Sequence, residues 1–448
     1  KLVVCHPQRI VDAGYSLEMM SIPGRDNKFD VYLFRQVSHQ LGNRLLFIIT
    51  VPSQVADQIK IFAFFRYGRN VESDSRRADC IVQGKNEGRE GMMKRADEGM
   101  AFMLRYENVA WYENGCVRIL DRRIYPIRTE YVTCHSHTEV AQAIADMVTQ
   151  SAGPYTAAAM GMALAAYEAA KKNVADIEGY MEKAAYTLSH ARPTTAEKMK
   201  LVTGAALAEA RRCLQEGKTG MLLVDAMQEY AFQYINNTYL KYMQTGATLA
   251  EKIPNHGTVM TQCFGETVIG TMLLACRRQG KEIKMICAET RPYFQGARLT
   301  ASVGCDMGFD TSVITDNMPG YVLNAKHVDV FTSAADVITM DGYVVNKIGT
   351  FQIALAANYW GIPYYVTGTP NLSHPSIDSV TIEERDPELV LEAMGTRVTM
   401  PGVKGIYPAF DITPPKLCSG VVTDRGIFPP TNLQAYYEGI DNIDQSLL

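Results

Sequence analysis

The amino-acid sequence predicts an α/β protein with three parts. Residues 246–448 alternate short apolar, β-branched runs with helix-forming stretches, which is typical of a parallel sheet covered by helices on both faces. Residues 109–245 carry Ala and Leu at helical spacing and predict a helical domain after a small β piece. Residues 1–108 mix aromatic runs with Gly-containing turns and predict an extra β-rich or α+β module of unknown role. The C-terminal domain is therefore expected to be Rossmann-like.

The elements of the first two parts follow from their local patterns. In the N-terminal module we expect strands at residues 29–35, 45–51 and 58–65. A hairpin-like piece at residues 109–128 leads into the helical domain. There we expect helices at residues 138–149, 155–171, 174–189, 195–215 and 220–243.

The expected strands of the C-terminal domain each end in polar or nucleophilic side chains. These strands are residues 257–261, 283–288, 311–315, 328–331 and 364–367, with helices such as 268–279 and 351–359 between them. The first runs into Cys263 and the fourth into Asp336. In an open parallel sheet, ligands bind outside the carboxyl ends of the strands. These side chains are therefore the candidate site.

The composition excludes several classes of function. With 44 Lys+Arg against 48 Asp+Glu the net charge is −4, so no basic surplus supports nucleic-acid or membrane-surface binding. The longest strongly apolar run, 45–51, is far shorter than the about 20 residues that span a bilayer. The ten scattered cysteines contain no C-x-x-C pair, which fits reduced thiols in a cytoplasm.

No metal or cofactor is expected. The cluster CHSH at residues 134–137 matches no zinc spacing and reads as a polar loop. Neither G-x-G-x-x-G nor G-x-x-x-x-G-K-[ST] follows the first strand, so a dinucleotide or P-loop site lacks its phosphate-binding loop.

Three segments have residue types that suit phosphate. Residues 289–300 (ETRPYFQGARLT) place two Arg and Gln295 just past a strand. Residues 346–350 (NKIGT) offer Lys347 with the amides of Gly349 and Thr350, which we expect to be free. Arg192 precedes the helix expected from residue 195. Each segment could equally be a solvated helix start with surface charges.

Cys263 and Asp336 form a candidate acid/base pair. Cys263 could instead be a buried structural thiol, the commoner fate of a free cysteine. Asp336 lies in an apolar stretch, where a carboxylate must be paired, protonated or functional. A partly desolvated carboxyl group with a raised pKa can donate a proton near neutral pH.

Residues 109 to about 435 resemble the 5-methylthioribose-1-phosphate isomerases of methionine salvage. This group shares its fold with ribose-1,5-bisphosphate isomerases and with regulatory subunits of translation initiation factor 2B. The matching stretches are ARPT at 191–194, TQC at 261–263, ETRPYFQGARLT at 289–300, ITDNM at 314–318, AD at 335–336, NKIGT at 346–350, ERDP at 384–387 and PAFDITP at 408–414. The N-terminal module lies outside the resemblance.

The resemblance implies roles for individual residues. Cys263 and Asp336 match the family's catalytic pair, and its substrate-binding residues, most of them phosphate ligands, match Arg192, Gln295, Asn346 and Lys347. The chain departs from the family in two loops. TQSAGP at 149–154 stands where the family has an Arg-Gly-Ala-Pro loop, and FGE follows Cys263 where Asn and a nearby Gly are usual.

From these observations we expect a cofactor-independent aldose–ketose isomerase. Its substrate would be a 5-substituted ribose-1-phosphate, converted to the ribulose-1-phosphate. The alternatives are a non-catalytic phosphosugar- or nucleotide-binding subunit of the translation-factor type, and a ribose-1,5-bisphosphate isomerase. We expect a cytoplasmic homodimer with no nucleic-acid or membrane partner. Apolar segments at 407–410 and 427–430 could form the interface or only close the core.

Overall fold

The computed structural model describes residues 95–192 and 196–439, and the bounds of four strands before them. The chain divides into two compact units, Lys1–Met93 and Lys94–Leu448. In the first unit β1 (Leu17–Glu18), β2 (Asp30–Arg35), β3 (Arg44–Thr50) and β4 (Ile61–Arg66) form an antiparallel sheet in that order. The other predictions for this module lie outside the described residues.

The second unit begins with short elements against the helical part. They are η1 (Phe102–Leu104), α2 (Tyr106–Val109) and a small antiparallel sheet of β5 (Ala110–Glu113), β6 (Cys116–Leu120) and β7 (Tyr131–Cys134). Tyr106 is fully buried, and its hydroxyl donates to Asn236 Oδ1 at 2.8 Å. Residues 95–108 therefore pack with the second unit. The three-domain division expected from the sequence stays a prediction.

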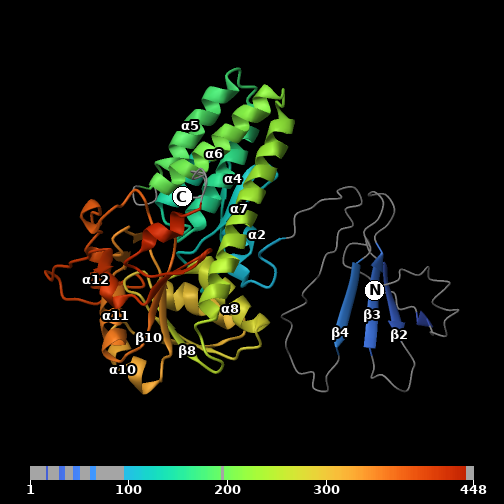
Figure 1. The fold of residues 1–448 in the computed structure, drawn as a ribbon. Helices are drawn as coiled ribbons and strands as arrows, with labels where there is room; N and C mark the ends of the chain where they lie inside the picture. Colours follow the sequence, from blue (N-terminus) through green and yellow to red (C-terminus); the bar gives the residue numbers. More distant parts are fainter. Residues whose placement is uncertain are drawn as a thin grey trace. The chain divides into compact units, whose positions relative to one another are not determined.

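The helical part is an elongated bundle (Figure 1). It contains α3 (His137–Ala145), α4 (Gly153–Lys171), α5 (Ile177–Ser189), α6 (Ala196–Gln215) and α7 (Met221–Ala250), close to the predicted ranges. Helix α4 is buried on nearly every face because most of its residues are Ala, Gly or Met. A Cβ at Gly161 would meet Leu188 at 3.0 Å, so this glycine permits the close approach of α5. Ser136 and Asp176 cap α3 and α5 by accepting backbone N–H groups.

The C-terminal part contains a seven-stranded sheet. Its strands are β8 (Thr258–Thr261), β9 (Lys284–Ala288), β10 (Asp310–Ile314), β11 (Val330–Ala334), β14 (Tyr364–Thr367), β18 (Gly420–Thr423) and β19 (Gly426–Phe428), in the order β10-β9-β8-β11-β14-β18-β19. All neighbours are parallel except β18 and β19. The five predicted strands match the first five of these. The sequence analysis missed β18 and β19.

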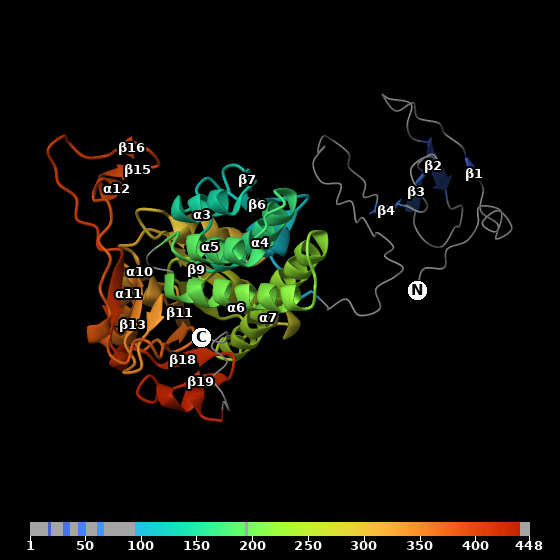
Figure 2. The ribbon, with the colours of Figure 1, turned by 90° about the horizontal axis from the view of Figure 1, so that it is seen from above.

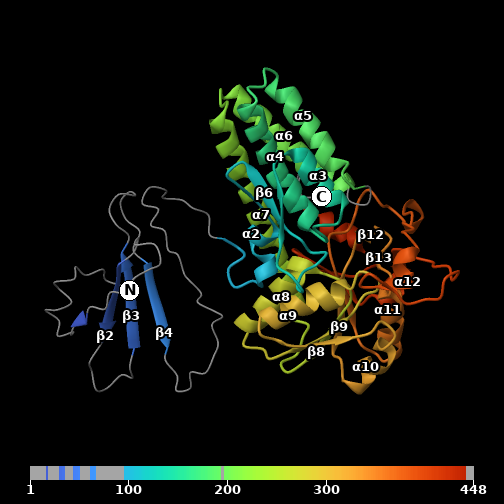
Figure 3. The same cartoon turned by 180° about the vertical axis from the view of Figure 1, so that it is seen from behind.

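Helices cover both faces of this sheet (Figure 3). They are α8 (Glu266–Arg278), η3 (Gly296–Thr300), α9 (Ala301–Asp306), α10 (Pro319–Ala325) and α11 (Thr350–Tyr359). Successive strand residues enter opposite cores, as the period of a strand requires. Val259 packs in the core shared with α8 and the bundle, whereas Met260 packs in the core shared with α10 and α11.

The remaining elements lie around the carboxyl end of the sheet and at the C-terminus. β12 (Val337–Ile338), β13 (Val344–Lys347) and β17 (Phe410–Thr413) form a small antiparallel sheet. α12 (Glu388–Leu391), β15 (Glu392–Ala393) and β16 (Thr396–Arg397) form an arm at the edge of the molecule (Figure 2). Short turns of helix are η4 (Ile377–Ser379), η5 (Pro415–Leu417) and η6 (Leu433–Tyr437). Within the described residues, no helix is long and apolar enough to cross a bilayer.

A buried ion pair joins the small β-sheet to the start of α8. The Nη1 atom of Arg122, which follows β6, lies 2.7 Å from Glu266 Oε1, and the two side chains are 0% and 2% exposed. Arg122 Nη1 also donates to the carbonyl oxygen of Gln150, and Glu266 Oε2 accepts from the backbone N–H of Ala152. The pair therefore fixes the loop at 149–153, where the family's Arg is missing.

We expect Glu266→Ala to lower the free energy of unfolding by about 3–5 kcal/mol, because it leaves the Arg122 charge buried and unpaired. Replacing both partners, as in Arg122→Met with Glu266→Leu, should cost less than the sum of the single changes. Glu282→Gln is the control, since Glu282 is exposed and pairs with His256 at the surface. Urea unfolding measures these variants and the two single changes of the double variant. A loss of under about 1 kcal/mol in Glu266→Ala would contradict this role.

Candidate active site

The strand order places Cys263 and Asp336 at the point where the direction of winding reverses. In chain order β8, β9 and β10 extend the sheet to one side, and β11 and β14 extend it to the other, so β8 and β11 are neighbours. Their register pairs Thr261 with Thr332. Cys263 lies two residues beyond the end of β8 and Asp336 two residues beyond the end of β11. Such a reversal at the carboxyl ends of parallel strands is where ligands bind in open α/β sheets.

Cys263 is held in an uncommon backbone conformation. Its φ is +61°, a left-handed value that few non-Gly residues adopt and that occurs at functional sites. Its backbone N–H donates to Thr290 Oγ1 at 3.0 Å, and its carbonyl oxygen accepts from Thr300 Oγ1. Both threonines belong to the 289–300 segment, so this segment positions Cys263.

Cys263 carries a protonated thiol at neutral pH. Burial raises the pKa of its thiol to about 11, although the positive charge of Lys347 opposes the shift. Asp336 raises the pKa of the thiol further, so its carboxyl group lies within electrostatic reach of the Cys263 sulfur. A thiol with this pKa suits proton donation better than proton abstraction.

The residue Asp336 is partly accessible to solvent, but protein atoms lie densely enough around its carboxyl group to desolvate it. Its backbone N–H donates to the carbonyl oxygen of Val345 at 2.9 Å, which fixes it beside β13. Desolvation by the surrounding protein raises the pKa of its carboxyl group, whereas Lys347 and Arg192 lower it. The net shift is upward, so this acid holds its proton to higher pH than an ordinary aspartate.

Two predicted cations share this desolvated region. Lys347 ends β13 and is buried, with Nζ 4.4 Å from the centroid of the Phe410 ring. Desolvation lowers the pKa of the Lys347 ammonium group, while Cys263 and Asp336 favour its charged form. Desolvation likewise lowers the pKa of Arg192, and Asp336 raises it. The structure therefore brings Cys263, Asp336, Lys347 and Arg192 together.

Arg385 is a cation of this site that the sequence analysis did not assign. It acts electrostatically on Cys263, Asp336, Lys347 and Arg192. Its Nε lies 2.8 Å from Glu383 Oε1, and its guanidinium stacks near the rings of Tyr293 and Phe410. The ERDP stretch at 384–387 contained it, but no spacing tied that stretch to a strand end.

Gln295 and Asn346 occupy different surroundings. Gln295 is buried, and its Oε1 has no hydrogen-bond partner within the described part of the chain, so it can accept from a ligand. The side chain of Asn346 donates to Thr350 Oγ1 at 2.9 Å. Because neighbouring residues of a strand point to opposite faces, Asn346 lies on the face opposite to Lys347.

The expectation of free amides in the NKIGT segment is wrong for Gly349. Its N–H donates to Asp411 Oδ2 at 2.7 Å, because β17 pairs with β13 and brings that carboxylate to the start of α11. The arginines of the 289–300 segment are also engaged. Arg291 donates to the carbonyl oxygen of Glu392 at 2.7 Å, and Arg298 to that of Arg122 at 2.7 Å.

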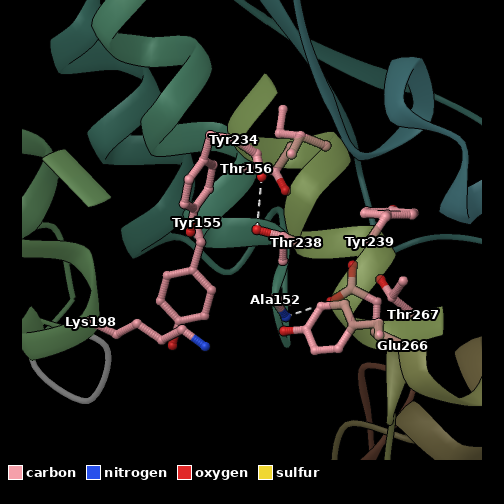
Figure 4. Close-up of a pocket in the computed structure, with 11 residues that line it drawn as sticks. Ala152, Tyr155, Thr156, Lys198, Tyr234, Thr238, Tyr239, Glu266 and Thr267 are labelled. Carbon is pink, nitrogen blue, oxygen red and sulfur yellow. Dashed lines mark hydrogen bonds between the residues drawn. The ribbon is translucent and has the colours of Figure 1, made fainter. Parts of the chain in front are cut away.

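A small cavity lies between α4, α7 and the start of α8 (Figure 4). Its wall includes four tyrosines and is formed by Ala152, Tyr155, Thr156, Lys198, Tyr234, Ile235, Thr238, Tyr239, Tyr242, Glu266 and Thr267. Tyr155 connects it to the site, since the phenol feels the charge of Asp336 and the Lys198 ammonium lies 4.7 Å from its ring centroid. The cavity is thus a neighbour of the candidate pair.

Among residues 95–192 and 196–439, no group of three or more His, Cys, Asp and Glu side chains is placed to hold a metal ion.

Comparison with known proteins gives consistent results. Residues 149–430 match the model of the initiation factor 2 subunit family. A methylthioribose-1-phosphate isomerase from Heliobacterium modesticaldum is 35% identical over 73% of this chain and 97% of its own length. One from Chloroflexus aurantiacus is 34% identical over 72% of this chain and 96% of its own.

Solved structures agree with the sequence relatives. The 5-methylthioribose 1-phosphate isomerase of Pyrococcus horikoshii superposes with a TM-score of 0.65 at 29% identity, over 74% of this chain and 95% of its own. The delta subunit of translation initiation factor eIF-2B from A. fulgidus superposes with a TM-score of 0.62 at 29% identity, over 72% of this chain and 96% of its own.

The raised thiol pKa predicts slow alkylation of Cys263. Between pH 7 and 9.5 its rate with iodoacetamide should rise about tenfold per pH unit, because only the thiolate reacts. Lys347→Met should slow it further, since the charge that favours the thiolate is gone. Peptide mass spectrometry measures the rate, with exposed Cys305 as the reference. A plateau already reached at pH 8 would mean that Cys263 is a thiolate.

Proposed function

Since this chain belongs to the initiation factor 2 subunit family, we propose that it works as the isomerases of that family do. It converts 5-methylthioribose-1-phosphate, or a close analogue, to the corresponding ribulose-1-phosphate without a cofactor. The observation that carries this proposal is the pair of Cys263 and Asp336 at the reversal of strand order, with Lys347 and Arg192 beside them. The sequence relatives with the same named activity support it.

The substrate dictates the first step. A phosphate on C1 prevents ring opening to a free aldehyde, so the ordinary enediol route is closed. Protonated Asp336 donates to the ring oxygen as the bond between that oxygen and C1 breaks. Desolvation raises the pKa of Asp336, which favours the protonated form that this step needs.

Hydrogen then moves from C2 to C1. In a hydride shift the C2 hydrogen moves with its electron pair, and the Asp336 carboxylate takes the proton of the C2 hydroxyl as the ketone forms. In the enolate route Cys263 is the thiolate that removes the C2 proton, or the thiol that protonates C1. The high pKa of Cys263 favours the hydride shift, with the thiol as a neutral neighbour. Deuterium retained fully at C1 would exclude a solvent-exchanging thiolate base.

The phosphate must be held during this step, because it is a good leaving group on a developing oxocarbenium ion. Buried Lys347 and half-buried Arg192 supply two positive charges for it, and Arg385 adds a third nearby. Gln295 has a buried Oε1 without a partner among the described residues, which supports a role in accepting from a sugar hydroxyl. Asn346 of β13 donates to Thr350 Oγ1, so it supports the start of α11.

The tyrosine-lined cavity favours a 5-methylthio group over a 5-phosphate. Sulfur contacts aromatic rings favourably. Glu266 forms part of the wall, but Arg122 pairs with it, so this pair offers no free positive charge to a second phosphate. Lys198 is the cation among the lining residues, and it packs on Tyr155. A ribose-1,5-bisphosphate is therefore the less suitable substrate.

The second candidate is a non-catalytic regulatory subunit that binds a phosphosugar. The similarity to the eIF-2B delta subunit of A. fulgidus is the observation in its favour. The presence of both Cys263 and Asp336, brought together at one edge of the sheet, favours the enzyme.

A substrate panel separates the candidates. The 5-methylthio, 5-deoxy and 5-phospho forms of ribose-1-phosphate are incubated with the protein and followed by phosphorus NMR. We expect the 5-methylthio compound to turn over fastest. Tightest binding of one compound with no turnover of any would instead support the regulatory subunit.

On the best substrate, Cys263→Ser and Asp336→Asn should each lower kcat by about 10² or more, the scale of a lost acid/base group. The two losses should be strongly non-additive, since both groups serve one reaction path. Asp336→Asn should be no less stable at pH 7, because a neutral amide avoids carboxylate desolvation. Near-normal turnover by Cys263→Ser, with folding checked by circular dichroism, would make Cys263 a structural thiol.

We further propose a cytoplasmic homodimer that forms through the sheet domain. The segment at 407–410 does not supply the interface, because Tyr407, Ala409 and Phe410 are buried within the chain. Tyr321 on α10 and Tyr359 on α11 are large and exposed and form a better candidate surface.

Light scattering at micromolar concentration should give about twice the chain mass of 49.7 kDa. A species of the single-chain mass would contradict the dimer. Exposed Tyr186 on α5, changed to Lys, is a control that should leave the mass unchanged, whereas Tyr359→Lys should lower it.

A further inference from the structure

Asp411 holds the turn that follows Lys347. It lies on β17, directly across from Asn346 of β13. Its Oδ2 accepts from the backbone N–H groups of Gly349 at 2.7 Å and Phe351 at 3.1 Å. One carboxylate oxygen therefore receives two amides at the start of α11, where the positive end of the helix favours a negative charge.

The same turn is tied to Cys263. Its carbonyl oxygen at Ile348 accepts from Gln262 Nε2 at 3.0 Å. Gln262 precedes Cys263 in the chain, and its Oε1 lies 3.3 Å from Thr290 Oγ1. That hydroxyl oxygen also accepts the backbone N–H of Cys263. A displacement of the turn would thus be felt at Lys347 and at Cys263 alike.

The turn has little freedom to adapt. Gly349 has a φ of +105°, which favours glycine, and a Cβ there would lie 2.8 Å from Gln262 Nε2. The backbone N–H of Ile348 is bound to the carbonyl oxygen of Ala409. The Asp411 carboxylate adds to this restraint by accepting the amides of Gly349 and Phe351.

We propose that ionised Asp411 is a positioning residue, which fixes the turn after Lys347 and thereby holds that lysine beside Cys263 and Asp336. This inference rests on the proposed function for its effect on turnover, but its effect on Lys347 and Cys263 does not depend on the substrate.

The raised pKa of Asp411 shows that desolvation opposes the ionisation of its carboxyl group. Burial raises the pKa of its carboxyl group to about 6, although the amides of Gly349 and Phe351 and the charge of Lys347 oppose the shift. Its Oδ1 is buried with no partner among the residues that the structure describes. Other ionisable groups near it are Tyr364, which feels its charge, and Arg291, Asp316 and Tyr407, which line the same 450 Å³ hollow.

The sign of the pH effect follows from this pKa. Because the folded-state pKa lies above the usual value of about 4, the folded protein favours protonated Asp411, and stability from this group is lost as pH rises to about 6. Activity should change in the opposite direction and fall as pH drops through about 6. Asp336 is the proposed proton donor, so its ionisation lowers activity as pH rises, which is opposite in sign to the effect of Asp411.

The test compares Asp411→Asn and Asp411→Ala with wild type on the best substrate from pH 5 to 9. Asn keeps an acceptor but not the charge, so kcat/KM at pH 8 should fall about tenfold, and the acid limb near pH 6 should disappear. Ala should lose about 10². The melting temperature of Asp411→Asn at pH 8 should not drop.

Asp329→Asn is the matched control. Asp329 also accepts a backbone N–H, from Thr258 at 2.8 Å, but at the amino end of the sheet. Its kcat/KM and acid limb should be those of wild type. An Asp411→Asn enzyme with wild-type kcat/KM and an unchanged acid limb would overturn the proposal, as would a loss explained fully by unfolding.

A second readout works without any substrate. Loss of the Asp411 charge should loosen the turn that holds Lys347 near Cys263. Because the Lys347 charge favours the thiolate, Cys263 should alkylate about threefold more slowly at pH 9 in Asp411→Asn. The Asp329→Asn control should not change this rate. If no sugar phosphate turns over, the proposed function fails while the alkylation rate still decides the role of Asp411. An unchanged rate would contradict that role.

Discussion

The parallel pairing of β8 with β11 is the constraint on which the site depends. These strands are neighbours because the chain extends the sheet first to one side and then to the other. Cys263 follows the end of β8 by two residues, and Asp336 follows the end of β11 by two residues. The helices on both faces bury the bodies of β8 and β11, so the polar side chains gather beyond the strand ends.

Desolvation at this edge links the protonation states of the groups gathered there. Alone, it raises the pKa of the Cys263 thiol and of the Asp336 carboxyl group and lowers that of the Lys347 ammonium group. Each charge partly offsets the desolvation of its opposite. The result is a carboxyl group with a raised pKa and a thiol that keeps its proton at neutral pH, with three cations beside them. A phosphate would compensate the mutual repulsion of Lys347, Arg192 and Arg385.

The local sequence pattern was sufficient to predict five strands of the seven-stranded sheet, but it did not identify every residue of the candidate site. Alternating strands and helices placed Cys263 and Asp336 at strand ends, since that depends only on neighbours in the chain. Asp411 could not be placed in this way, because its partner Gly349 is brought near by the pairing of β17 with β13. The prediction that Arg298 suits phosphate failed for a similar reason. A guanidinium near a helix start suits phosphate, but in the fold it reaches backbone carbonyls instead.

The departures from the family's loops have one physical consequence. Where the family places an Arg on the phosphate, the loop at 149–153 is fixed by Arg122 through the carbonyl oxygen of Gln150. Glu266 neutralises Arg122 and also accepts from the backbone N–H of Ala152, so the Arg122 charge stabilises the loop. Because the pair is buried, its charge offers nothing to an anion. In the proposed function, phosphate recognition therefore rests on Arg192, Lys347 and Arg385, which suits a substrate with one phosphate.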